Sequence, residues 1–361
     1  MNKLTKKIKG LKKTTKVDFA TYLGVVLAFV LFSVLRDAGV LNRSITGMLV
    51  PICAYIVMAV SLNLTVGILG ELSLGHAGFM SVGAFSGVIA SQSLQASIPS
   101  APARLVIAIL VGAVFAAIAG TIVGVPVLRL QGDYLAIVTL AFGEIIKELI
   151  NCLLVGYDSN GLHMAFNLDG SLTINDIGME PGGMAIIKGA QGATGTETIA
   201  SFTAGFILIM ITLVIVLNLV RSRAGRAIMA LRDNRIAAES VGINVTKYKM
   251  MAFVTSAALA GAAGALYGLN YSNLAASKFS FDTSILVLVY VVLGGLGNMW
   301  GSIIAAAVLY FLPEALRQFA DFRMLVYAIV LILVMLATNS EQLKTLAGRV
   351  LPKRKGGAHN G

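Results

Sequence analysis

The sequence predicts an all-α integral membrane protein with about ten transmembrane helices, in a range of about eight to ten. The first observation is composition. Of the 361 residues, 57% are hydrophobic and 12% are charged, whereas an average soluble domain is about half apolar and about a quarter charged. The second is that glycine is frequent, with 38 residues, and proline is rare, with 7, which suits closely packed membrane helices. The third is the length of the uncharged runs.

Each uncharged run is compared with the roughly 20 apolar residues that a helix needs to cross the hydrocarbon core. The runs that meet or approach this length, the last interrupted by charges, cover residues 19–35, 44–70, 72–103, 105–128, 198–220, 250–277, 283–313, 324–340 and 134–157. The run 283–313 would measure about 46 Å as one helix at about 1.5 Å per residue, which is too long for one untilted span. We expect it to break at the glycine-rich stretch from Gly294 to Gly301.

Basic residues give the expected orientation. The chain has 28 Lys and Arg against 17 Asp and Glu, a formal net charge of +11, and most of the basic residues fall in the blocks 1–16, 221–249 and 344–355. Loops rich in Lys and Arg stay on the cytoplasmic side, and about ten crossings place all three blocks there. Because the positive charge flanks apolar runs in this way, it does not indicate nucleic acid as a partner.

These assignments divide the chain into three parts. They are a basic cytoplasmic tail at 1–16, a transmembrane domain at 17–340 and a second basic cytoplasmic tail at 341–361. Within the transmembrane domain, 221–249 is a cytoplasmic segment and 156–197 is a polar external loop. Two interpretations of this loop stay open, because it can bind a partner or simply connect two spans.

The sequence predicts neither a metal site nor an enzyme. Cys53 and Cys152 each stand alone in an apolar stretch, without the second thiol that a disulfide framework or a zinc site requires. There is no paired His or Asp cluster at acid–base spacing. There is also no G-x-x-x-x-G-K-S/T phosphate loop, so any ATP hydrolysis requires a separate chain.

The stretch 221–242 predicts a short amphipathic helix on the cytoplasmic side. Ile228, Leu231, Ala238 and Val241 are spaced by multiples of three and four residues, which places them on one face. Charged residues mark the other faces.

Gly242 is suited to end this helix. The small side chains of Ala237 and Ala238 would let a groove on another protein approach the backbone closely. From the residues alone, a helix that couples to a partner and a plain positively charged loop are equal alternatives.

Several motifs resemble the branched-chain amino acid permeases of ABC importers. They are Asn63-Leu64-Thr65-Val66-Gly67, the stretch Gly70 to Phe79, the stretch Arg129 to Ile146, Arg232-Asp233-Asn234 with Ala237-Ala238-Glu239, and Gly294-Gly295-Leu296-Gly297. The resemblance extends from about residue 45 to about residue 335 and is strongest to the LivM-like branch of the LivH/LivM family. Permeases for urea and short amides share much of this pattern, and nucleoside permeases share the wider architecture.

The resemblance implies a type II ABC importer permease-like bundle in the cell membrane of a prokaryote. It implies a non-catalytic subunit that forms the translocation pathway for leucine, isoleucine and valine. The alternative cargo is urea, short amides or nucleosides, and a stand-alone carrier or channel is a further alternative. The implied partners are two ATP-binding subunits that use ATP and Mg²⁺, a second, LivH-like permease, and an extracytoplasmic substrate-binding protein. This chain itself would bind no cofactor.

The Ala-Ala-Glu-x-x-Gly order resembles the coupling segment with which such permeases dock into the ATP-binding subunit. This resemblance favours a coupling helix over a plain positively charged loop. The residues that it assigns to coupling are Arg226, Ala230, Arg232, Asp233, Asn234, Ala237, Ala238, Glu239 and Gly242.

Polar groups and glycine breaks within the apolar runs are the candidates for the translocation pathway. Charges at membrane depth are costly, and irregular backbone there needs a protein or water neighbour. The candidates are Asn63, Thr65, Gly70, Glu71, Ser73, His76, Thr139, Glu144, Gly294, Gly295 and Gly297. Three alternatives stay open: an ion pair of Lys147 with Glu144 and Glu148, tight glycine packing at both breaks, and a hydrogen-bonded interior position for His76.

Overall fold

A computed structural model describes residues 13–40, 42–130, 132–167, 172, 174–180, 183–316, 328–329 and 332. The chain divides into two compact units, 1–307 and 308–361, the first of which holds nearly all of the described elements. The predicted tails, apart from residues 13–16, and nearly all of the predicted span 324–340 lie outside the described residues.

Long helices coincide with the predicted spans. They are α2 (Lys13–Asp37), α3 (Arg43–Asn63), α4 (His76–Ser93), α5 (Ala101–Val127), α6 (Asp133–Asn151), α7 (Phe202–Arg221), α10 (Val245–Gly268), α11 (Phe281–Gly294) and α12 (Met299–Ala315). Helix α3 continues into a π-helical turn, η1 (Leu64–Leu69). Among the described residues, 4 helices are long and apolar enough to cross a membrane, namely α3 with η1, α5, α7 and α10. The total of about ten spans stays a prediction.

Helices α4, α5 and α10 pack together, and glycines make their close approach possible. A Cβ added to Gly112 on α5 would lie 2.8 Å from the carbonyl oxygen of Gly83 on α4. A Cβ added to Gly83 would lie 2.1 Å from the carbonyl oxygen of Gly261 on α10. A side chain at these positions would push the helices apart, which is why small residues are common where membrane helices meet.

The long run 283–313 breaks where the sequence predicts. Helix α11 ends at Gly294 and α12 begins at Met299. Between them, Gly295 and Gly297 have φ values of +93° and +81°, a backbone conformation that glycine adopts without strain. The predicted break is therefore confirmed.

A five-stranded antiparallel sheet occupies most of the predicted external loop, so the all-α prediction is wrong in this region. The strand order is β2-β1-β3-β4-β5. The elements are β1 (Leu153–Asp158), β2 (Gly161–Phe166), η2 (Ile174–Ile177), β3 (Met184–Lys188), η3 (Gly189–Gln191), β4 (Ala193–Thr194), β5 (Asn273–Leu274) and η4 (Ala276–Phe279). The predicted span 134–157 accordingly divides into α6 and β1. A lack of charge indicates burial but does not separate a helix from a short strand.

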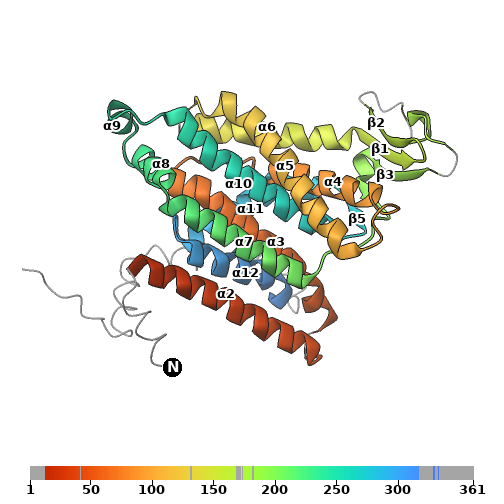
Figure 1. Ribbon diagram of the computed structural model, residues 1–361, viewed down its shortest axis with the longest axis horizontal. Helices are drawn as coiled ribbons and strands as arrows, with labels where there is room; N and C mark the ends of the chain where they lie inside the picture. Colours follow the sequence, from red (N-terminus) through yellow and green to blue (C-terminus); the bar gives the residue numbers. More distant parts are fainter. Residues whose placement is uncertain are drawn as a thin grey trace, which may run out of the picture. The chain divides into compact units, whose positions relative to one another are not determined.

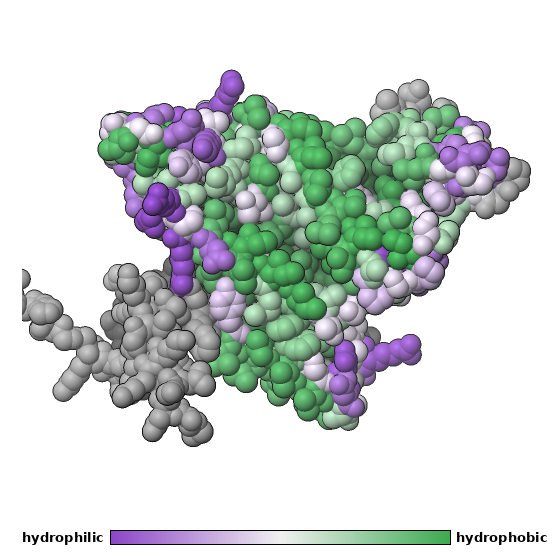
Figure 2. Space-filling model, in the orientation of Figure 1, coloured by the Kyte–Doolittle hydropathy of each residue, from purple (hydrophilic) through white to green (hydrophobic). Residues whose placement is uncertain are grey.

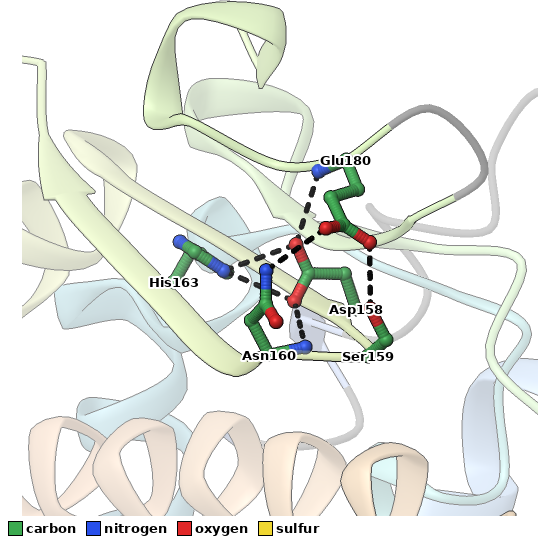
Figure 3. A network of polar contacts seen from close by, with 5 residues as sticks. All are labelled: Asp158, Ser159, Asn160, His163 and Glu180. Carbon is green, nitrogen blue, oxygen red and sulfur yellow. Dashed lines mark hydrogen bonds and ion pairs between the residues drawn. The ribbon is translucent and has the colours of Figure 1, made fainter.

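Asp158 connects the β1–β2 hairpin to the chain that precedes β3 (Figure 3). Its carboxylate accepts hydrogen bonds from the backbone N–H groups of Glu180 at 3.0 Å and Asn160 at 2.8 Å, and it lies 3.1 Å from His163 Nε2. The Glu180 carboxylate accepts a hydrogen bond from Ser159 Oγ at 2.6 Å. The Glu180 N–H above all, and then the Asn160 N–H and the His163 ring, hold the pKa of Asp158 below its ordinary value. The region is a folded element, and its binding of a partner stays a prediction.

Two short helices, α8 (Arg223–Asp233) and α9 (Arg235–Ser240), lie at one end of the bundle, and the sheet lies at the other (Figure 1). Hydrophobic residues cover the middle of the helices, and hydrophilic residues gather at the two ends (Figure 2). On α5 the exposed apolar side chains recur every four residues, at Val106, Leu110, Val114, Ile118 and Ile122. An apolar band with polar ends is the surface that a bilayer requires.

Candidate coupling and translocation site

The predicted cytoplasmic segment forms two capped helices, whereas the sequence predicts one. Ser222 caps α8, because its Oγ accepts a hydrogen bond from the Gly225 N–H at 3.1 Å. Asn234 caps α9, because its Oδ1 accepts from the Ala237 N–H at 3.0 Å. An asparagine that satisfies the free N–H groups at a helix start favours a new helix there. The single-helix prediction is therefore wrong at Asn234.

Gly242 ends α9, as the sequence predicts. It has a φ of +84°, and its N–H donates to the carbonyl oxygen of Glu239 at 3.0 Å. The next N–H, of Ile243, donates to the carbonyl oxygen of Ala238 at 3.1 Å. This is the Schellman arrangement, in which glycine takes the left-handed position after the helix.

The new helix at Asn234 changes which residues face the bundle. Leu231, Ala238 and Val245 form a buried cluster, but Val241, which the sequence predicts on the same face, is 75% exposed. Because Ala238 packs inward against this cluster, it is not open to a groove on another protein, so the prediction is wrong for Ala238, while Ala237 is exposed. The spacing fails because α9 starts its own helical phase.

The outward side of α9, called the α9 surface below, consists of exposed side chains. Two of them are large and apolar, Ile236 at 80% and Val241 at 75% exposure. Ala237 and Glu239 are exposed beside them. Exposed apolar side chains at a polar end of the bundle are candidates for contact with a partner.

Arg232, near the end of α8, connects this segment to the first glycine break. Its Nη1 donates to the carbonyl oxygen of Gly67 in η1 at 3.0 Å, and its Nη2 pairs with Asp233 at 3.2 Å. Its stem packs on Gly70, where an added Cβ would lie 2.5 Å from Arg232 Cγ and where φ is +81°. A residue predicted for coupling and one predicted for the pathway are thus in direct contact.

A buried ion pair makes a second connection between the same regions. Lys249 on α10 pairs with Glu71, which follows η1, and the two side chains are only 5% and 14% exposed. Removing one partner from a buried pair leaves an uncompensated charge. The sequence singles out Glu71 but not its partner, because Lys249 belongs to a basic block whose expected function is orientation.

Asn63 joins the two glycine breaks. Its Oδ1 accepts from the Gly297 N–H at 2.8 Å, and its Nδ2 donates to Ser302 Oγ at 2.9 Å. Both side chains are fully buried. A Cβ added to Gly67 would lie 2.3 Å from the Gly297 nitrogen, so the breaks touch each other through backbone. Tight glycine packing is confirmed here, and the pathway role of these residues stays a prediction.

Side chains from α6 and α11 hold the irregular chain between η1 and α4 and the first turn of α4. The Leu74 N–H donates to Thr139 Oγ1 at 3.1 Å, and the Ala77 N–H donates to Ser284 Oγ at 3.1 Å. Buried N–H groups outside regular structure need such partners. Thr139 therefore positions the backbone, while Ser284 is a member of this site that the sequence does not indicate.

His76 is a hydrogen-bonded interior residue. Its Nε2 lies 2.8 Å from Ser61 Oγ, and that hydroxyl donates to the carbonyl oxygen of Met58 at 2.9 Å. Since the hydroxyl proton is used, the His76 Nε2–H is the donor to Ser61. Two other predicted pathway residues differ from His76, because Thr65 Oγ1 and Ser73 Oγ are buried and have no hydrogen-bond partner among the described residues.

Two of the predicted residues lie apart from these contacts. Glu144 pairs with Lys147, which also lies 3.4 Å from Glu148, so the ion-pair alternative is confirmed. The other Glu144 oxygen accepts from the Phe281 N–H at the start of α11 at 3.1 Å. Arg226 is exposed on α8 and donates to a backbone carbonyl oxygen at 3.3 Å.

Comparison with known proteins identifies the family. The sequence matches the family described as "Branched-chain amino acid transport system / permease component" over residues 44–337. The chain belongs to this permease family. The predicted resemblance is confirmed, and the apolar helices and the family together make the chain a multi-pass membrane protein.

Among the relatives of this permease, the LivM proteins have higher sequence identity to it than a sugar permease has. It is 34% identical to the high-affinity branched-chain amino acid transport system permease protein LivM of Salmonella typhimurium (strain LT2), over 78% of this chain and 66% of that protein. It is 33% identical to LivM of Escherichia coli (strain K12) over the same shares. The fructose import permease protein FruG of Bifidobacterium longum (strain NCC 2705) is more distant, at 27% identity over 84% of this chain and 85% of FruG. The match thus spans just under two thirds of the LivM relatives, and no solved structure matches.

Proposed function

We propose that this permease is the non-catalytic membrane subunit of an ATP-driven importer and forms the translocation pathway for branched-chain amino acids. The observation that carries the proposal is the contact of Arg232 with Gly67, because it bonds a helix at the end of the bundle to a broken segment inside it. Support for the cargo comes from the LivM relatives, which are named for this transport and are more similar than the fructose permease.

The α9 surface is the proposed docking site for an ATP-binding subunit. Its apolar side chains would be covered by a partner, and Glu239 gives it a charge at the edge. ATP and Mg²⁺ would be held by that partner, because this sequence lacks a phosphate loop. The proposed complex contains two ATP-binding subunits, a second, LivH-like permease and an extracytoplasmic binding protein. The α8–α9 end and both termini then lie on the cytoplasmic side of a prokaryotic cell membrane.

A movement of α8 would act directly on the first glycine break. Arg232 on α8 holds the carbonyl oxygen of Gly67 within the turn, and Lys249 at the start of α10 holds Glu71 just after it, so the turn is attached to both helices. Asn63, one helical turn before Gly67, belongs to the same backbone. Docked ATP-binding subunits that move α8 would therefore move this turn as well.

The second glycine break would respond because Asn63 is bonded to Gly297. When the first turn moves, this contact either follows or separates, and separation would expose the backbone between the breaks. Thr65 in η1 and Ser73 after it have buried hydroxyl groups without a partner among the described residues, so they are the proposed polar contacts for cargo. Weak contacts are sufficient in a pathway that releases what it binds.

The test compares uptake with ATP hydrolysis after reconstitution of the permease with its partner subunits in vesicles. Arg232→Ala removes a charge-assisted hydrogen bond, which is worth about 1.5–3 kcal/mol. We expect ATP-driven leucine uptake to fall at least roughly tenfold while ATP hydrolysis continues. Arg36→Ala removes an exposed arginine at the far end of α2 and serves as the control, with both rates unchanged. Uptake without any ATP-binding subunit would instead support a stand-alone carrier or channel.

A further inference from the structure

Buried polar groups without partners gather at the sheet end of the bundle. Arg104, near the start of α5, is 2% exposed, and its Nη2 donates to Glu197 Oε2 at 2.7 Å. Its Nε and Nη1 are buried and have no hydrogen-bond partner in the described part of the chain. The same holds for Ser91 Oγ and for both the oxygen and the nitrogen of the Gln92 side-chain amide.

The packing of α4 on α5 places Ser91 opposite Arg104. The pairs in close contact are Gly83 with Gly112, and Gly87 with Ala108. Each step of four residues forward on α4 matches four residues backward on α5, as expected for two antiparallel helices in contact. The next pair in this series is Ser91 with Arg104, at the ends of the two helices nearest the sheet.

Two further elements reach the same place. Gln92 faces the end of α10, because Val88, one turn before it, lies 3.3 Å from the Cβ position of Gly268. The chain after β4 arrives there because the Ile199 N–H donates to the carbonyl oxygen of Leu269 at 3.1 Å. Four elements therefore converge on the unpartnered groups: the ends of α4 and α10, the start of α5 and the chain after β4.

These groups need ligands more than a lone buried hydroxyl does. A guanidinium keeps its charge and all of its N–H groups at any ordinary pH, and buried donors are almost always paired in native proteins. Gln92 adds a donor and an acceptor that are also unused. The side chain of Glu197 is 44% exposed, so the group is connected to water on one side.

The charges decide which ligand fits. Arg104 and Glu197 are the only charged residues in the stretches 88–108, 193–201 and 265–275, and they cancel. An anion alone would leave the buried site with an excess negative charge, and a cation alone would leave it with an excess positive charge, which is costly. A zwitterion brings both charges and leaves the site neutral.

We propose that Ser91, Gln92, Arg104 and Glu197 form a weak binding site for an amino-acid zwitterion. The carboxylate of the ligand binds Arg104 Nε and Nη1 together with the Gln92 side-chain nitrogen, and its ammonium group binds Glu197. The site gives the permease its own recognition of cargo at the end opposite α8 and α9. The proposal rests on the proposed function for the identity of the cargo.

The test measures ligand binding to the full chain in lipid nanodiscs, with no binding protein present, by saturation-transfer NMR. Three probes separate the parts of the ligand: leucine, 4-methylpentanoate, which lacks the amine, and 3-methylbutylamine, which lacks the carboxylate. We expect leucine to bind in roughly the millimolar range and each analogue to bind at least about tenfold more weakly. Arg104→Gln weakens leucine at least about tenfold, and Glu197→Gln weakens leucine but not 4-methylpentanoate.

Two further variants serve as controls for this test. Thr212→Val removes another buried hydroxyl without a partner, on α7, and leaves leucine binding unchanged. Gln92→Leu keeps the Arg104–Glu197 pair and weakens leucine, even if Arg104→Gln fails to fold. The proposal is overturned if leucine shows no saturable binding, if 4-methylpentanoate binds as tightly as leucine, or if Gln92→Leu binds normally. Failure of the proposed function appears separately, as absence of ATP-driven uptake in the wild type.

Discussion

The two ends of the bundle differ in the partners of their polar side chains. At the α8–α9 end, Arg232, Lys249 and Asn63 all have partners in the two glycine breaks. Among the described residues, only Arg235 Nη1 and the hydroxyls of Thr65 and Ser73 are buried without a partner there. At the sheet end, Arg104 and Gln92 keep donors and an acceptor without partners. A satisfied network holds its members in one arrangement, so the first end is suited to transmit a movement. The second end is suited to receive a ligand.

The comparison also explains where a small change has a large effect. Arg232, Lys249 and Asn63 each bond a backbone group or a charge on a different element, so one substitution releases two elements from each other. Near the sheet, the ring of hydrogen bonds around Asp158 is local, because it joins residues 158–163 to Glu180. Substitutions there should affect the sheet and leave the helices as they are.

Replacing Asn63 is expected to have the largest effect on stability. Asn63→Leu leaves the Gly297 N–H and Ser302 Oγ without the amide, and a buried donor left unpaired costs about 1–3 kcal/mol. Ser302→Ala is the matched control, since it removes one of the two bonds and keeps the contact with Gly297. We expect the free energy of unfolding, measured by reversible denaturation in mixed micelles, to fall clearly more for Asn63→Leu. Equal losses would show that Asn63 does not hold the breaks together.

The Asp158 network should give a smaller and pH-dependent effect. The folded-state pKa of Asp158 lies below its ordinary value of about 3.9, so the carboxylate stabilises the fold above that value. This stabilisation is lost as the pH falls through the lowered folded-state pKa. We therefore expect Asp158→Asn to lower the melting temperature at pH 7 and to differ less from wild type as the pH drops below about 4. A difference that is constant with pH would contradict this account.

The sequence predicts the elements of this fold better than their connections. Uncharged runs locate the long helices, and glycines locate the break after Gly294, because both patterns follow from transfer into lipid and from helix propensity. The sequence does not predict the strands at 153–158 and 161–166, because an apolar stretch of that length fits a strand or a helix end equally well. The helix start at Asn234 is not predicted, because an asparagine can stand at a helix cap or inside a helix, and the residue type alone does not distinguish the two.

The contacts that carry the proposed mechanism are the least predictable part. Arg232 and Gly67 are 165 residues apart in sequence, and no local pattern relates them. Lys249 looks like an ordinary residue of the basic cytoplasmic block, which the positive-inside pattern already explains. Arg104 is a lone basic residue between two apolar runs. Only the folded structure shows that Lys249 pairs with Glu71. It also shows that Arg104 bonds Glu197 through Nη2 and leaves Nε and Nη1 without a partner among the described residues.

If Arg232 transmits movement from α8 to the glycine breaks, nucleotide binding by the partner subunits should change a distance measured to the second break. Spin labels are placed at Leu296→Cys, which is 58% exposed in the second break, and at Ile118→Cys, 51% exposed on α5. The two native cysteines are replaced first. Pulsed EPR on the complex with its ATP-binding subunits then compares the distance distribution with and without a non-hydrolysable ATP analogue. We predict that the analogue shifts the distribution in the otherwise wild-type chain and leaves it unshifted in Arg232→Ala. An equal shift in both would contradict the claim.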